Sequence, residues 1–186
     1  MGDVTDVTID TVTTDFHTNE PGNGRTVGVC IAFDRGTNGV TVRNVSCKNT
    51  WRGVVVMVGT TLPYMSPKLS GIGVRNIYVS NLTFEGDFGT GFTNELSTDP
   101  ITNVTWDGVT ILKGGAAEGN RCYNRCACVS RWYTVCQSSD WKQPFENVRF
   151  RNFRGALGDM PAPGWGCAAN QTKCDIEFEG WAPTIP

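Results

Sequence analysis

Residues 28–59 read GVCIAFDRGTNGVTVRNVSCKNTWRGVVVMVG, and this stretch decides the fold. It holds three short runs of β-branched and apolar residues, broken by glycine and asparagine, at 29–33, 40–47 and 54–58. Runs this short predict strands joined by tight turns, because they are too short for helices. Cys30 and Cys47 lie on two of the runs. If the strands stack coil upon coil, a disulfide between them would join successive coils.

One short phrase recurs along the chain. Its pattern is asparagine, apolar, polar, apolar, polar, and then asparagine or glycine. Copies begin at Asn44, Asn76, Asn103 and Asn147, with a fainter copy at Asp6. Two apolar residues spaced two apart face one side of a strand, and asparagine suits the flanking turns because it tolerates left-handed backbone.

Recurrence of one strand-and-turn unit, with insertions of variable length between copies, is typical of a solenoid. No helical phrase separates the copies, so the sequence predicts an all-β fold, a right-handed parallel β-helix. Asparagines in equivalent turns would then stack in hydrogen-bonded ladders. A sandwich of short antiparallel strands is the alternative, but hairpins would mostly alternate the environment of a repeated phrase.

The chain of 186 residues is long enough for one substantial core, so residues 1–186 are predicted to form a single domain. Residues 113–141 leave the repeat as a cysteine-rich insertion. The closing stretch, with Trp165, Trp181 and the last prolines, is expected to cap the open edge of the final coil. The chain opens inside a strand phrase, so we expect it to be the C-terminal part of a longer protein.

Composition narrows the partners and the compartment. A net charge of −2 without a basic patch argues against nucleic acid and anionic membrane. No stretch is long and apolar enough to span a membrane. The sequence predicts an extracellular monomer without metal or cofactor.

The eight cysteines are predicted to form disulfides, because there is no C-x-x-C pair and only one histidine for a zinc site. They are Cys30, Cys47, Cys122, Cys126, Cys128, Cys136, Cys167 and Cys174. Glycosylation sequons are compatible with secretion and occur at Asn44, Asn81, Asn103 and Asn170. At Asn44 and Asn103, ladder packing would compete with a glycan.

The phrase Cys30-Ile31-Ala32-Phe33, followed by Cys47 and then by Arg52-Gly53-Val54, resembles the central signature of the polygalacturonases, the family 28 glycoside hydrolases. The resemblance continues through the asparagine-valine repeats to the pair Cys167 and Cys174. It implies hydrolysis of pectin, in which one carboxylic acid protonates the glycosidic oxygen and other carboxylates activate water. The implied partner is an acidic, pectin-like polysaccharide.

The chain departs from this signature at the positions that carry the chemistry. The resemblance aligns the family's aspartate pair with Gly28 and Val29, and its histidine with Arg52. The family's Arg-x-Lys pair falls near Gly91-Phe92-Thr93. Neither glycine nor valine can transfer a proton, so the catalytic set that the resemblance implies is missing.

Other residues could rebuild a site. Asp15 and Glu20 are candidates for a relocated acid and base, and His17 and Arg52 are candidates for substrate binding. Guanidinium matches carboxylate geometry, so Arg52 suits an anionic sugar. A solvated polar loop and a structural ion pair explain the same residues.

The sequence therefore leaves two classes of function open. One is a polygalacturonase-type hydrolase. The other is a non-catalytic relative that binds acidic polysaccharide or serves as a structural module.

Overall fold

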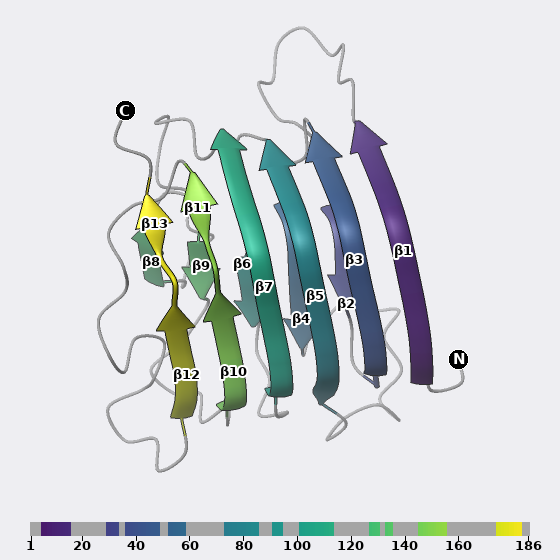
Figure 1. The fold of residues 1–186 in the computed structure, drawn as a ribbon. Helices are drawn as coiled ribbons and strands as arrows, with labels where there is room; N and C mark the ends of the chain where they lie inside the picture. The colour runs from purple at the N-terminus through teal and green to yellow at the C-terminus, as the bar shows by residue number, and fades with distance from the viewer. Residues whose placement is uncertain are drawn as a thin grey trace, which may run out of the picture.

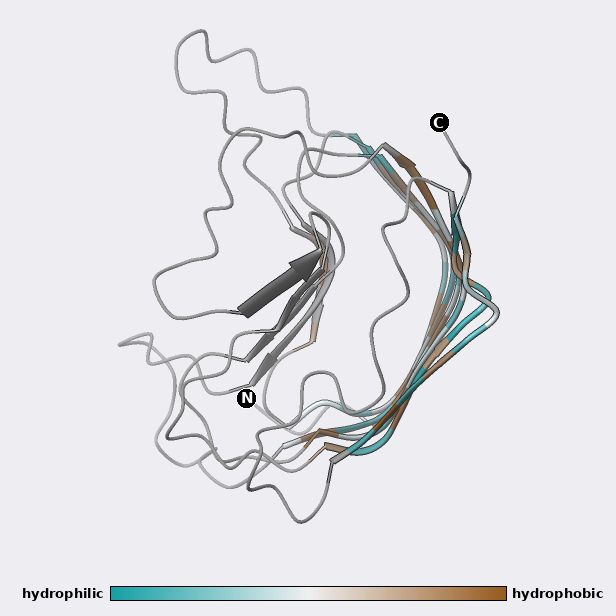
Figure 2. Cartoon of the chain, turned by 90° about the vertical axis from the view of Figure 1, so that its left-hand side faces the viewer, coloured by the Kyte–Doolittle hydropathy of each residue, from teal (hydrophilic) through white to brown (hydrophobic). Residues whose placement is uncertain are grey.

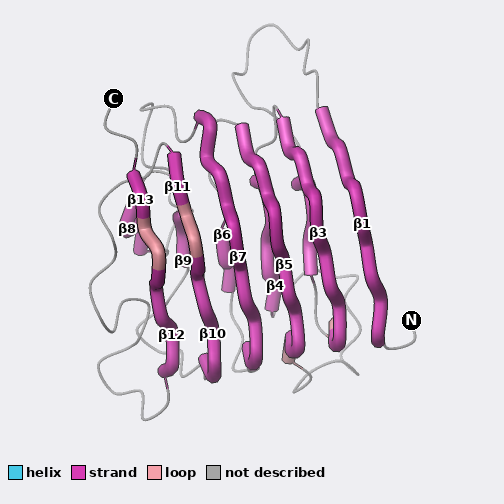
Figure 3. Tube along the Cα trace, in the orientation of Figure 1, coloured by secondary structure: helices cyan, strands magenta, loops and turns pink. Residues whose placement is uncertain are grey.

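The computed structural model describes residues 5–15, 29–33, 36–48, 52–58, 73–85, 91–94, 101–113, 127–130, 133–135, 145–155 and 174–183. All of the regular secondary structure in these segments is β-strand (Figure 1, Figure 3). The strands build two parallel sheets and one short antiparallel pair. The all-β class predicted from the sequence is confirmed for this part of the chain.

The larger sheet, sheet A, is a stack of long parallel strands. In spatial order they are β1 (Thr5–Asp15), β3 (Asn38–Lys48), β5 (Val74–Glu85), β7 (Ile101–Lys113), β10 (Phe145–Arg151) and β12 (Cys174–Glu179). The short strands β11 (Arg154–Gly155) and β13 (Ala182–Pro183) continue the last two levels, with β11 paired to both β7 and β13. Every described pairing in this sheet is parallel.

Sheet B lies opposite sheet A and is smaller (Figure 2). It contains β2 (Val29–Phe33), β4 (Arg52–Val58) and β6 (Gly91–Asn94), again all parallel. From β1 to β7 the chain passes alternately through sheet A and sheet B, and each return adds a strand beside the previous one. This is what a β-helix requires, and neither sheet has the antiparallel pairing of a sandwich. The one antiparallel pair described, β8 (Ala127–Ser130) with β9 (Tyr133–Val135), lies within 113–141.

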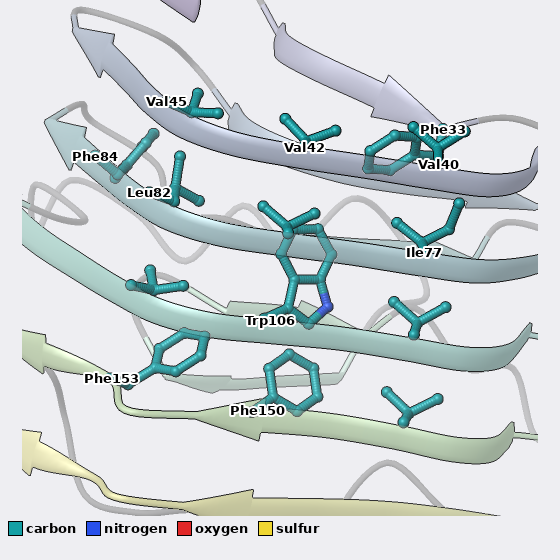
Figure 4. Close-up of a cluster of buried hydrophobic side chains, with 14 of the residues drawn as sticks. Phe33, Val40, Val42, Val45, Ile77, Leu82, Phe84, Trp106, Phe150 and Phe153 are labelled. Atoms are coloured by element: carbon teal, nitrogen blue, oxygen red, sulfur yellow. The ribbon is translucent and has the colours of Figure 1, made fainter. Parts of the chain in front are cut away.

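The core lies between the sheets and is built from rows of apolar side chains that repeat from strand to strand (Figure 4). One row consists of Val42, Val79, Trp106 and Phe150, which are register neighbours across four strands. Their exposed fractions are between 0% and 3%. Trp106 is thus a core residue, as its place in the repeat predicts.

From β1 to β10, each level of sheet A turns at two residues with left-handed backbone, and the described part of the β12 level turns at Gly180, which gives the sheet its curved cross-section (Figure 2). The first corner has φ values from 53° to 70° and comprises Asp6, Gly39, Asn76, Asn103 and Asn147. The second has values from 55° to 69° and comprises Thr11, Asn44, Asn81, Gly108, Asn152 and Gly180. Left-handed backbone is costly for most residues, and asparagine and glycine tolerate it best.

The corner asparagines form the predicted ladders. The Asn76 Nδ2 atom donates to Asn38 Oδ1 at 2.7 Å, and Asn103 Nδ2 donates to Asn76 Oδ1 at 3.0 Å. Asn147 Nδ2 continues the ladder to Asn103 Oδ1 at 2.9 Å. Each amide therefore donates towards the strand that precedes it in the stack.

Three corner residues without a side-chain amide show a second arrangement. There the side chain of the preceding residue supplies the acceptor oxygen. The acceptors Asn38, Asp10 and Asp107 precede Gly39, Thr11 and Gly108. Asn44 Nδ2 lies 2.8 Å from Asp10 Oδ1, and Asn152 Nδ2 lies 2.6 Å from Asp107 Oδ1. The ladder thus continues through a level whose corner residue has no side-chain amide.

The structure corrects the phase of one predicted repeat. The phrase beginning at Asn44 was expected to match the phrase beginning at Asn76. Instead Asn44 stands at the second corner, where Asn81 Nδ2 donates to its Oδ1 at 3.0 Å. The register partner of Asn76 on β3 is Gly39. The side-chain amide of that level lies one residue earlier, on Asn38.

The disulfide between Cys30 and Cys47 is present, but it does not join neighbouring strands of one sheet. Cys30 lies on β2 in sheet B and Cys47 on β3 in sheet A, so the bond ties the two sheets together. Because β2 completes the pass that begins with β1, and β3 begins the next pass, the bond also links successive turns of the chain, as expected. The pairing of the other cysteines lies outside the described side chains and stays a prediction.

The described part of the closing stretch continues sheet A and does not lie across its end. β12 pairs in parallel with β10, and β13 pairs with β11. Trp181 stacks on Phe153 with ring centroids 5.4 Å apart and meets Phe178 edge-on at 5.9 Å. Its role is therefore packing within a further level, and Trp165 lies outside the described residues.

Replacing Asn81 separates the two contributions of a corner asparagine. Asn81→Ala and Asn81→Gly both remove the hydrogen bond to Asn44, but only alanine places a Cβ in left-handed backbone. We expect Asn81→Ala to lose roughly 0.5–1 kcal/mol more unfolding free energy than Asn81→Gly, because strain of about 1–2 kcal/mol exceeds the entropy advantage of alanine. Urea denaturation measures both values. Equal losses would contradict a backbone contribution.

Two corner glycines provide a second, matched comparison. A Cβ at Gly39 would lie 2.9 Å from Asp6 Oδ1 and 3.0 Å from the Asp6 backbone nitrogen. At Gly108 the nearest atom, the Asn81 backbone nitrogen, is 3.6 Å away, which is ordinary contact. Since asparagine tolerates the positive φ at both sites, we expect Gly108→Asn to melt near the wild-type temperature and Gly39→Asn several degrees lower. Thermal unfolding by circular dichroism decides this, and the reverse order would contradict the packing argument.

Candidate functional site

Sheet B brings the signature positions of the sequence onto neighbouring strands. β2 carries Val29, β4 begins at Arg52, and β6 begins at Gly91. Val29 and Arg52 are direct register partners, and Gly91 pairs with Val55 further along β4. In the row that joins β2 to β4, a valine is therefore the register partner of an arginine.

The start of β2 is held in place by anchors on both sides. Phe33 is buried and Ile31 packs partly buried against the same core. Cys30, next to Val29, is bonded to Cys47, and the Thr14 hydroxyl donates to Cys30 Sγ at 3.0 Å. Because β1, β2 and β3 all meet at Cys30, the position of Val29 is fixed by both sheets.

Of the predicted site residues, Asp15 is the one whose side chain is described. It ends β1, is exposed, and pairs in register with Lys48, which in turn pairs with Glu85. Alternating charges across neighbouring strands stabilise a sheet. This row favours a structural role for Asp15.

The remaining candidates are placed only in part. Arg52 has a described backbone position, and its side chain lies outside the description. His17, Glu20 and Gly28 lie outside the described residues. Their proposed roles therefore stay predictions.

Carboxylates on the outer face of sheet A serve the ladders. Asp10 accepts from Asn44 Nδ2, from the Thr11 hydroxyl at 3.1 Å and from Arg43 Nε at 2.7 Å. These hydrogen bonds, that of Asn44 foremost, lower the pKa of Asp10. At the other end of the sheet, hydrogen bonds from Arg149 lower the pKa of Asp175.

A general acid must keep its proton near the working pH, which requires a raised carboxyl pKa. The pKa values of Asp10 and Asp175 are lowered, so both are structural anions. Tyr78 donates its hydroxyl to Asp107 Oδ2 at 3.2 Å, and partial burial together with that carboxylate raises its pKa. Tyr78 is accordingly a hydrogen-bond donor and not a base.

The described residues contain no cluster of three or more histidine, cysteine, aspartate or glutamate side chains suited to a metal ion. Within the same residues there is also no helix with the length and apolar character needed to cross a membrane.

The ladder acceptors Asp10 and Asp107 are the polar residues that sequence reasoning missed. Their signal is a carboxylate directly before a corner residue that lacks an amide. Three of the sequon asparagines also belong to the ladders. Their Nδ2 atoms each donate a hydrogen bond to a neighbouring strand, and the residues are Asn44, Asn81 and Asn103. A glycan would take one of the two hydrogens of the same nitrogen and would compete with the ladder for space, while Asn170 lies outside the described residues.

The lowered pKa values of Asp10 and Asp175 predict acid sensitivity. A carboxyl with a folded pKa below its unfolded value of about 3.9 stabilises the fold above that pH, and the contribution is lost as pH falls through the folded pKa. We expect the urea midpoint to change little from this source above about pH 5 and to fall below it, as the pH passes the unfolded and then the folded pKa values.

Asp175→Asn provides the control for this measurement. The variant removes the ion pair of 2.8 Å with Arg149, so it should be less stable than the wild type at neutral pH. Its midpoint should also fall less on acidification. A pH profile parallel to that of the wild type would contradict the assignment to Asp175.

Comparison with known proteins finds a distant similarity to two fungal proteins. The chain is 25% identical over 168 residues to proteins named as probable endo-xylogalacturonan hydrolase A from Aspergillus flavus and Aspergillus oryzae. The aligned region covers 84% of this chain and 37% of each relative, so the chain spans well under half of their length. No family model matches the chain. A search of solved structures likewise finds no match.

Proposed function

We propose that this chain is a polygalacturonase-like protein directed at galacturonan-type, acidic polysaccharide, of the kind found in pectin. The observation that carries the proposal is the stacking of β2, β4 and β6 in sheet B, in the order of the signature strands. The similarity to probable endo-xylogalacturonan hydrolases supports the same class of polysaccharide. An extracellular location follows from such a substrate.

The scaffold of the proposal is a right-handed parallel β-helix. Alternate passage through sheets A and B, with parallel pairing at each level, supports winding in coils. Crossovers between parallel strands of one sheet are right-handed in nearly all proteins, which supports the hand. In such a coil the strands of sheet B present one row of side chains after another to an extended polysaccharide.

A second candidate function is binding without hydrolysis, and the pairing of Val29 with Arg52 favours it. Valine has no proton to transfer, whereas guanidinium forms paired hydrogen bonds to carboxylates. A uronate carboxylate would be repelled by aspartates but attracted by an arginine. In that case the row of Val29 and Arg52 would still bind the uronate carboxylate but would have no acid to protonate the glycosidic oxygen.

One pair of assays tests both functions. Retention on immobilised polygalacturonate measures binding, and release of reducing sugar from polygalacturonate and xylogalacturonan measures hydrolysis. We expect binding that Arg52→Ala weakens by about tenfold, because hydrogen bonds to charged groups contribute on the order of 1.5–3 kcal/mol. Arg52→Lys keeps the charge without the planar fork and should fall between the two.

The outcomes separate the functions. Sugar release that is lost in Glu20→Ala would assign hydrolysis to a relocated carboxylate. Binding without release would assign the second function. A protein that neither binds nor cleaves either polysaccharide would refute the proposal.

A further inference from the structure

Tyr78 is the one aromatic residue that points outward between the two corners of sheet A, among the described levels from β1 to β10. It stands between the buried residues Ile77 and Val79, so it belongs to the face of the sheet that points away from sheet B (Figure 2). Its neighbours in the same row are Thr41 on β3 and Thr105 on β7, whose side chains are shorter. Tyr78 is accordingly 41% exposed, in the middle of a polar face.

The hydroxyl of Tyr78 fixes the position of its ring. It donates to Asp107 Oδ2 at 3.2 Å, and Asp107 is the register partner of Ser80, which makes it a diagonal neighbour of Tyr78. Diagonal neighbours lie roughly 7–8 Å apart, so the tyrosine has to lie along the sheet to make this bond. The other oxygen of Asp107 accepts from Asn152 Nδ2 at 2.6 Å, which holds the carboxylate in turn. One face of the ring therefore lies towards the strands and the other towards solvent.

Two arginines flank the ring along the stack of strands. They are Arg43 on β3 and Arg151 on β10, in the same row as Asp107. Arg43 Nε lies 2.7 Å from Asp10 Oδ2, and 52% of the Arg43 side chain is exposed. Arg151 Nε lies 3.3 Å from Glu179 Oε2, and 46% of the Arg151 side chain is exposed. Each guanidinium is held through its Nε, so its terminal amino groups can donate to a ligand.

The mixture of charges on this face favours a neutral, hydroxylated ligand. Cationic donors and anionic acceptors stand on neighbouring strands, and a sugar hydroxyl can both donate and accept. A carboxylate or a phosphate accepts only, and it would meet Asp10 and Asp107 as well as the arginines. One aromatic ring among polar side chains also offers little apolar surface for a protein partner, because a stable interface buries about 800 Å² on each side.

We propose that the outer face of sheet A around Tyr78 binds a neutral polysaccharide. One pyranose ring would stack on Tyr78, and hydroxyls of neighbouring sugars would bond to Arg43 and Arg151. The C–H groups of a pyranose are attracted to the negative face of an aromatic ring. The arginines are three levels apart, roughly 14 Å along the stack, which an oligosaccharide of a few rings can cover. Because Tyr78 is already held in place, stacking costs little side-chain entropy.

This site lies on the opposite side of the core from sheet B and is independent of the proposed galacturonan function. Affinity electrophoresis of the full chain in gels that contain xyloglucan or galactomannan, both neutral and soluble, tests it. We expect one or both to retard the wild-type chain, and Tyr78→Ala to lower the affinity by about tenfold. Tyr78→Phe keeps the ring but not its hydrogen bond to Asp107, so its affinity should lie between the two. No retardation by either polysaccharide would overturn the proposal.

A matched variant and a competitor locate the site. Leu112→Ala removes an apolar side chain that is 57% exposed near the end of β7, beyond the second corner, and should bind as the wild type does. Polygalacturonate in excess should leave the retardation unchanged, because an acidic chain does not match this face. Thermal unfolding of each variant reports that it is folded. Equal weakening by Tyr78→Ala and Leu112→Ala, or displacement by polygalacturonate, would overturn the proposal.

Discussion

The left-handed corner residue is the constraint on which the rest of this structure depends. A residue with φ near 55° is disfavoured for most side chains, yet sheet A places one at the same two positions in level after level. Asparagine accepts this backbone, and its side chain forms a hydrogen bond to the level before it. Backbone preference and ladder bonding therefore select the same residue at the same place.

The corners also set the register of the core. Between Asn76 and Asn81 the chain has room for two inward side chains, Ile77 and Val79, and for two outward ones. A slip of one residue would move every inward side chain to the solvent face and break both ladders. The corners thus fix a single register for the strands of sheet A. The disulfide between Cys30 and Cys47 then fixes the position of β2 in sheet B relative to sheet A.

Much of sheet A was predictable from sequence, because the Asn-apolar-polar-apolar pattern reports local backbone and strand alternation together. The phase error at Asn44 arose because Asn38 and Gly39 divide between them the roles that Asn76 performs alone. The disulfide between Cys30 and Cys47 was predicted, but its path from sheet B to sheet A was not, because no local pattern assigns the two strands to different sheets. The register pairing of Val29 with Arg52 depends on the path of a whole coil, so the sequence did not predict it.

The interactions that hold the fold and those that would serve an acidic polysaccharide are spatially separate. The ladders and their carboxylates occupy the outer face and corners of sheet A, whereas Val29 and Arg52 begin strands of sheet B. Phe33 anchors β2 in the core, and Cys30 anchors it through the disulfide to Cys47. Residue 29 is not among the residues that form the described corners and ladders. A scaffold organised in this way can keep its corners, ladders and disulfide while the residues that begin the strands of sheet B vary.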